Sequence, residues 1–270
     1  MTTGKPRPPV RPSWFDTKLP RARGDITWIY LWGAPLRFSH WLSAVTLLIL
    51  FVTGLFISFP MWVTAGEASS HFLMGRFRFI HYTAAAFLVF GGIIRVYWMF
   101  AGNQFERWPA LWPFTRTNLR HALTMLKSYA TLNADIQPHF VGHNPLAQGA
   151  YTTIYVLTTI MIFTGFAMYG QSNPGGFFYT MFGWVPSLLG GLQHVRLLHH
   201  SIAWFYPIFF CIHIYLAIRS DYLERAGVVS SMLTGGRFVA SHEKFEDCDL
   251  GDQPAVPWHT GEHPVWVKEP

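Results

Sequence analysis

Four histidines have the spacing of paired metal ligands: His40, His81, His199 and His213. Each lies in or at the end of a long apolar stretch, where an imidazole is costly unless it is paired or functional. His199 and His213 are fourteen residues apart, which at about 100° per residue falls roughly 40° short of four full helical turns. Both rings therefore project from nearly one face of a helix, about 21 Å apart along its axis.

Two levels of paired imidazoles are what two stacked b-type haems require, because two neutral imidazoles can hold one haem iron. In antiparallel spans, His81 and His199 lie at one membrane face, and His40 and His213 at the other. The pattern predicts one haem at each level. The alternative is that these histidines hydrogen-bond to neighbouring helices or line a proton path. None of the fourteen acidic residues lies in an apolar stretch, so a carboxylate proton relay is not indicated.

Four apolar stretches must position these ligands, approximately residues 38–59, 79–101, 149–170 and 198–218. Each is close to the roughly 20 helical residues that cross a bilayer. The chain is 51% hydrophobic and 13% charged, well below the roughly 25% charged residues of a soluble domain. The predicted fold class is all-α, an integral membrane four-helix bundle. Pro207 is expected to kink the last span.

The charged residues predict the domain organisation and the orientation. Counting Arg95 near the end of the second span, seventeen of the twenty Lys and Arg residues lie before the first span, between the second and third, or after the fourth. The positive-inside rule therefore places both termini in the cytoplasm. We expect a flexible cytoplasmic arm over residues 1–27, the membrane domain over 28–238 and a polar cytoplasmic tail over 239–270. The net charge of +6 is spread between apolar spans, so no nucleic-acid partner is predicted.

Two further residues fall level with the predicted haems by the same interval of fourteen. Gly54 follows His40 by fourteen residues, and a missing side chain there would make room for a porphyrin face; close helix packing is the alternative. Arg95 follows His81 by fourteen residues and would pair with a haem propionate, or else simply mark the cytoplasmic boundary.

The entry to the third span offers candidate quinone ligands, His143 and Asn144. A quinone carbonyl needs a hydrogen-bond donor and its reduction needs a proton, and a histidine near water can supply both. The alternative is that Asn144 and Pro145 cap the helix.

Several motifs together resemble the b-type cytochrome subunit of membrane-bound nickel-iron hydrogenases, a family of dihaem membrane cytochromes b. They are "APLRFSHWL" and "VTGLFI" in the first span, "GEASSHFLMGRFRFIHYTAAA" and "RVYWMFAGN" around the second, "GHNPLAQ" and "TGFAMY" at the ends of the third, and "HHSIAW" and "HIYLAIRSDY" in the fourth. The resemblance covers roughly residues 28–238, and the family's four axial histidines fall on the four selected above.

The resemblance implies a multi-pass protein of the bacterial cytoplasmic (inner) membrane that anchors an outward-facing hydrogenase. Its partners would be the iron-sulfur small subunit, through that subunit the large subunit, and quinone, to which it would pass electrons. No catalytic residue for hydrogen oxidation is expected in this chain. The alternatives are the same role for a formate dehydrogenase or a thiosulfate-type reductase, or a stand-alone transmembrane haem reductase.

Overall fold

The computed structural model describes residues 26–62, 66–67, 71–131, 133, 136–224, 226–240 and 245–247. Four helical segments in this part of the chain are long and apolar enough to cross a membrane. They are α1 (Ala34–Ser58), α2 (Leu73–Ala101), α4 (Pro145–Gly170) and the consecutive pair α7 (Leu192–Ala203) and α8 (Phe205–Glu224). The predicted all-α membrane bundle is confirmed, and each helix extends a few residues beyond its predicted range.

The fourth span is interrupted at Trp204, between α7 and α8. Pro207 lies three residues later, and a proline ring clashes with the carbonyl four residues before it, here that of Ala203. Ala203 is the last residue of α7. A kink was predicted here, and the interruption lies between His199 on α7 and His213 on α8.

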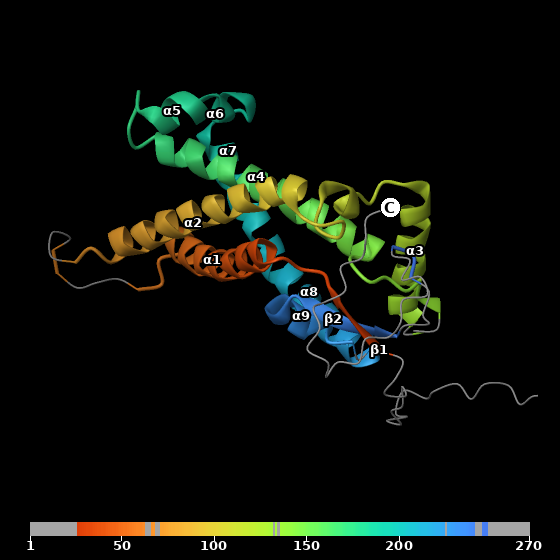
Figure 1. Ribbon diagram of the computed structural model, residues 1–270. Helices are drawn as coiled ribbons and strands as arrows, with labels where there is room; N and C mark the ends of the chain where they lie inside the picture. The colour runs from red at the N-terminus through yellow and green to blue at the C-terminus, as the bar shows by residue number, and fades with distance from the viewer. Residues whose placement is uncertain are drawn as a thin grey trace, which may run out of the picture.

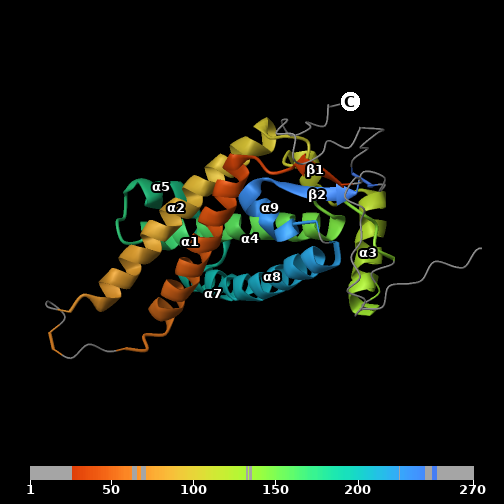
Figure 2. The same cartoon turned by 60° about the horizontal axis from the view of Figure 1, so that its bottom comes forward.

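The spans are arranged as two antiparallel pairs. Figure 1 and Figure 2 show α1 lying along α2, and α4 packs against α7. Gly91 permits close packing of the first pair, since a Cβ there would lie 3.1 Å from Cδ2 of Leu42. Many side chains on the spans face outward, among them Phe79, Ile93 and Phe100 at 64–71% exposure. A helix that is apolar on its outer face suits a hydrocarbon environment.

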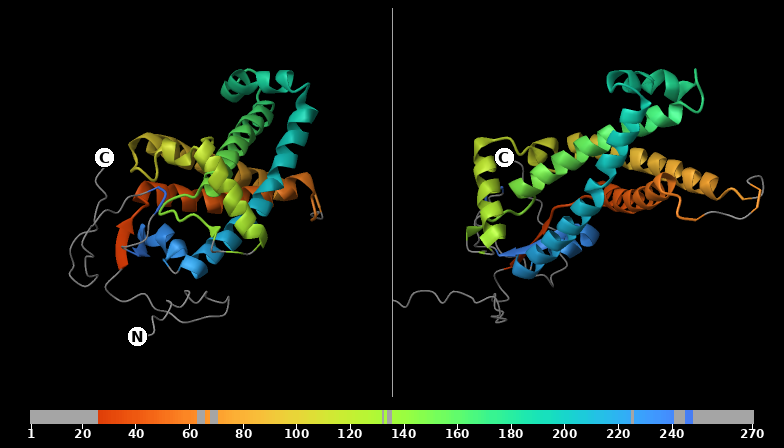
Figure 3. Two further views of the ribbon diagram at one scale, coloured as in Figure 1. Left: turned by 90° about the vertical axis from the view of Figure 1, so that its right-hand side faces the viewer. Right: turned by 180° about the vertical axis from the view of Figure 1, so that it is seen from behind.

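The shorter elements gather at the two ends of the bundle. Five short elements lie at one end, where α1 and α4 begin and α2 and α8 end. They are β1 (Ile26–Tyr30), η1 (Trp108–Leu111), α3 (Arg116–Thr131), α9 (Val228–Thr234) and β2 (Gly236–Ala240). At the opposite end lie α5 (Phe177–Phe182) and α6 (Trp184–Leu188), as both views of Figure 3 show.

A two-stranded sheet joins the beginning and the end of the membrane domain, which the sequence did not suggest. The strands β1 and β2 pair antiparallel, with Ile26 opposite Ala240 and Tyr30 opposite Gly236. The sheet therefore takes in the last residues of the range assigned to the arm and the first of the range assigned to the tail. The buried side chains beneath it are Ile29, Leu31, Trp32, Leu36, Phe105, Val141 and Val239.

Candidate functional site

The imidazoles of His40 on α1 and His213 on α8 face each other across the bundle. Their ring centroids are 6.2 Å apart and their planes are inclined by 52°. Two imidazoles that share one metal ion have their centroids roughly 6 Å apart, because each metal–nitrogen bond is about 2 Å long. Nδ1 of His40 is buried and has no hydrogen-bond partner in the described part of the chain. This spacing fits a shared iron.

The second pair consists of His81 on α2 and His199 on α7, which lie close enough to interact electrostatically. Nδ1 of His81 is 2.9 Å from Oγ1 of Thr53, and Nδ1 of His199 is 2.9 Å from Oγ1 of Thr164. With Nδ1 engaged on each ring, the nitrogen left to bind a metal is Nε2.

Glycines make room for both rings of this second pair. A Cβ at Gly54 would lie 3.3 Å from Cε1 of His81, and a Cβ at Gly165 would lie 3.4 Å from Cε1 of His199. Gly54 is therefore level with His81, as the sequence predicted. The space it leaves, however, accommodates the imidazole itself, and a contact with a porphyrin face stays a prediction.

Arg95 lies at the level of the other pair. Because Gly91 on α2 faces Leu42 on α1, Arg95, about one turn further along α2, lies near the level of His40. Its guanidinium is only 8% exposed. Nε donates to the hydroxyl of Tyr155 at 3.0 Å and Nη2 to the backbone carbonyl of Glu106 at 3.2 Å.

Nη1 of Arg95 is buried without a hydrogen-bond partner in the described part of the chain. An unpaired buried cationic donor is unfavourable, and a carboxylate such as a haem propionate would satisfy it. Taken together, the His40–His213 spacing, the engaged Nδ1 atoms of the second pair and this free donor fit two haem groups.

Asn144 caps α4, as the alternative reading of the sequence held. Its Oδ1 accepts a hydrogen bond from the backbone N–H of Ala147 at 2.8 Å, and Pro145 begins the helix. His143 is enclosed by aromatic rings, with the rings of Trp32 and Tyr151 each 4.6 Å from its own. A quinone contact by either His143 or Asn144 stays a prediction.

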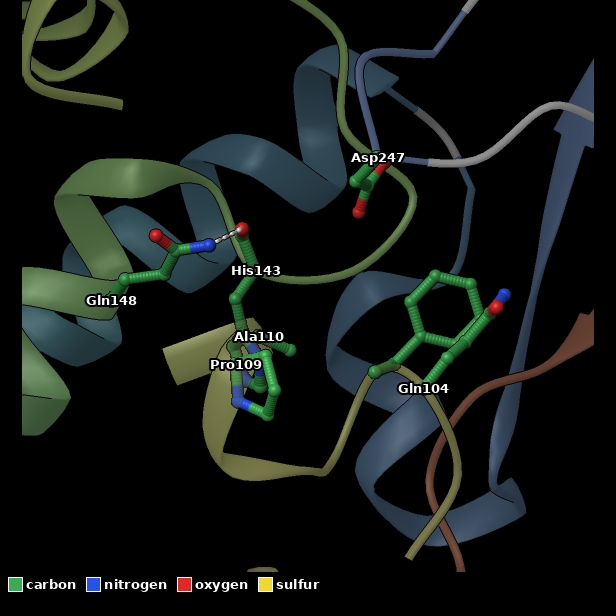
Figure 4. Close-up of a pocket in the computed structure, with 7 residues that line it drawn as sticks. Gln104, Pro109, Ala110, His143, Gln148 and Asp247 are labelled. Carbon is green, nitrogen blue, oxygen red and sulfur yellow. Dashed lines mark hydrogen bonds between the residues drawn. The ribbon is translucent and has the colours of Figure 1, made fainter. Parts of the chain in front are cut away.

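A cavity of about 240 Å³ adjoins His143, and Figure 4 shows its lining. The lining residues are Gln104, Phe105, Pro109, Ala110, His143, Gln148 and Asp247. Nε2 of Gln148 donates to the backbone carbonyl of His143. Asp247 accepts from the N–H groups of Val141 and Gly142, both at 2.7 Å. Burial, and to a lesser extent the nearby positive charge of Arg95, lower the pKa of His143 to about 3, so the ring is neutral.

Comparison with known proteins identifies the family. Residues 31–235 match the family described as "Prokaryotic cytochrome b561". The chain belongs to the prokaryotic cytochrome b561 family. The four spans and the four selected histidines all lie within the matched region, β1 ends just before it and β2 begins just beyond it.

Several relatives are named as B-type cytochrome subunits of Ni/Fe-hydrogenases. A "Probable Ni/Fe-hydrogenase B-type cytochrome subunit" of Cupriavidus necator is 44% identical over 77% of this chain and 86% of that protein. One of Rhizobium leguminosarum bv. viciae is 36% identical over 80% of this chain and 91% of that protein. A "Probable Ni/Fe-hydrogenase 1 B-type cytochrome subunit" of Escherichia coli K12 is 30% identical over 77% of this chain and 90% of that protein.

Sequence reasoning missed the residues that support the ligands. Thr53 and Thr164 contact the histidines, and Tyr155 contacts Arg95. One signal was present: a Thr-Gly pair occurs in the first span at 53–54 and again in the third at 164–165. Recognising this repeat would have pointed to both threonines.

Proposed function

We propose that this chain is the b-type cytochrome subunit of a nickel-iron hydrogenase and carries electrons from the hydrogenase iron-sulfur subunit to the quinone pool. The observation that carries the proposal is the 6.2 Å separation of the His40 and His213 rings, contributed by helices far apart in sequence. The names of the relatives support a hydrogenase as the partner. They favour a hydrogenase over a formate dehydrogenase or a thiosulfate-type reductase.

In this proposal His40 and His213 hold one haem b, and His81 and His199 hold the other. When bound, the two haems supply one-electron carriers at two depths in the membrane. The chain's own residues orient the imidazoles, exclude water and place Arg95 beside the inner group, the one bound by His40 and His213. The distribution of Lys and Arg supports a cytoplasmic position for both termini, so the His81/His199 pair faces outward in the bacterial cytoplasmic membrane.

The end of the bundle opposite the sheet is the proposed docking face for the iron-sulfur small subunit, and through it the large subunit. It presents α5, α6 and residues 59–62, which follow α1. Exposed aromatic and apolar side chains mark it, including Trp62 at 65%, Phe177 at 70% and Leu188 at 72%. Apolar and aromatic residues of this kind suit protein contact at the outer membrane surface.

Quinone would bind at the cytoplasmic end, in the cavity beside His143. That cavity is smaller than the roughly 300 Å³ at which typical ligand pockets begin, so it suits a quinone head group whose tail lies in the lipid. The neutral imidazole of His143 would donate a hydrogen bond to a quinone carbonyl. Replacing His143 should slow quinone reduction and leave the haem spectrum intact.

Haem quantitation and a reduced-minus-oxidised spectrum of the purified protein test the proposal. The unaltered chain should hold two b-type haems. His213→Ala and His81→Ala should each remove one. His200→Ala is the matched control, since His200 adjoins a ligand in sequence but its Nδ1 contacts Oγ of Ser58 instead. A colourless protein, or full haem content in both ligand variants, overturns the proposal, and co-purification from native membranes identifies the partner.

A further inference from the structure

The two helices that carry Thr-Gly pairs support the His81/His199 pair in the same way. On α1, Thr53 contacts Nδ1 of His81 and Gly54 accommodates its ring; on α4, Thr164 contacts Nδ1 of His199 and Gly165 accommodates its ring. Each threonine is buried, at 5% exposure for Thr53 and 2% for Thr164. The two arrangements match in residue type, in contact distance and in the ring atom that is contacted.

The direction of each hydrogen bond follows from the single hydroxyl proton. Oγ1 of Thr53 donates to the carbonyl of Ile49 at 2.6 Å, and Oγ1 of Thr164 donates to the carbonyl of Ile160 at 2.7 Å. A hydroxyl whose single proton is already donated to a backbone carbonyl can only accept a hydrogen bond from the imidazole. Each histidine is therefore protonated on Nδ1, and Nε2 keeps its lone pair.

The His40/His213 pair lacks this support at His40. Nδ1 of His40 is buried without a partner in the described part of the chain. Thr46 is also buried on α1, and its hydroxyl donates to the backbone carbonyls of Leu42 and Ser43. The two ligand pairs therefore differ chemically.

We propose that Thr53 and Thr164 are positioning residues that fix the Nδ1-protonated tautomer of His81 and His199, and so set the iron affinity and potential of the haem between them. This inference rests on the proposed dihaem function. A partner that accepts the Nδ1 proton orients the ring and raises the basicity of the coordinating Nε2. Greater basicity favours the oxidised iron, so the threonines lower the potential of this haem.

The test replaces each hydroxyl by a methyl group of similar shape. Thr53→Val and Thr164→Val should shift the midpoint potential of one of the two haems to more positive values. They should also weaken retention of that haem by about 10- to 100-fold, the usual cost of losing an outer partner of a metal ligand. Thr53→Ser and Thr164→Ser keep the acceptor and should behave as the unaltered protein. Thr46→Val is the matched control and should change neither haem.

The readouts are a redox titration followed in the haem α-band, electron paramagnetic resonance of the oxidised low-spin irons, and haem content. Potentials and haem content unchanged in both valine variants overturn the inference. The same holds if the serine variants lose haem like the valine variants, or if Thr46→Val reproduces their effect. If the unaltered chain binds no haem, the proposed function fails, which is a separate result.

Discussion

The backbone N–H of Gly33 donates to Oε1 of Glu106 at 2.5 Å, which ties the start of α1 to the connection after α2. Oε2 of the same carboxylate accepts from Nε1 of Trp98 at 2.9 Å and from the N–H of Asn103 at 3.1 Å. Glu106 is 1% exposed. A carboxylate at a helix N-terminus is favourable, and three donors compensate for its burial.

Replacing Glu106 should therefore destabilise the cytoplasmic end of the bundle. Glu106→Ala leaves three buried donors unpaired, at about 1–3 kcal/mol for each group that stays buried. Glu106→Gln keeps one acceptor and should cost less. The measurement is the free energy of unfolding in detergent. An alanine variant as stable as the unaltered protein contradicts this account.

Gly165→Ala should disturb one haem and spare the other. The new Cβ would lie 3.4 Å from Cε1 of His199, so the ring must shift by a few tenths of an ångström. The expected result is an altered spectrum or weaker retention of the haem bound by His199. Gly149→Ala on the same helix is the control, because a Cβ there meets nothing within 4 Å. It should be neutral or stabilise by about 0.4–1 kcal/mol. Equal effects from both substitutions rule out a specific role for Gly165.

The buried imidazole of His143 makes stability depend on pH. Its pKa in the fold, about 3, lies below the ordinary histidine pKa of 6.5, so the unfolded chain binds the proton more readily. Stability should fall as the pH drops below about 6.5, with a loss of about 2 kcal/mol at pH 5. His143→Phe removes this titration and keeps an aromatic ring between Trp32 and Tyr151. Between pH 7 and pH 5, the unaltered protein should therefore lose about 2 kcal/mol more unfolding free energy than His143→Phe does. Equal pH dependence in the two proteins contradicts the prediction.

Replacing Arg95 should change the potential of the haem that we propose for the His40/His213 pair. Arg95→Gln removes a buried positive charge near that level. Because the loss of this charge favours the oxidised iron, the midpoint potential of the haem should fall. Arg120→Gln, at an exposed position of α3, is the control and should leave both potentials unchanged. A redox titration distinguishes the two haems. A potential shift confined to the other haem would contradict the position of Arg95 near the His40/His213 pair.

The sequence by itself determined the four spans, because a helix that crosses a bilayer must be long and apolar. It also indicated the irregularity near Pro207, because proline removes a backbone donor. It also selected the four histidines, because a fixed helical rise and rotation converts a spacing of fourteen residues into two levels on one face.

Tertiary structure decided the contacts between helices. The pairing of β1 with β2 joins residues more than 200 positions apart, and neither short strand carries a decisive pattern alone. The bonds of Thr53 to His81 and of Thr164 to His199 depend on the rotation of one helix against its neighbour. Likewise, the three donors that surround Glu106 come together only when the ends of α1 and α2 meet. Periodicity within a helix says which residues share a face, and packing alone says what that face touches.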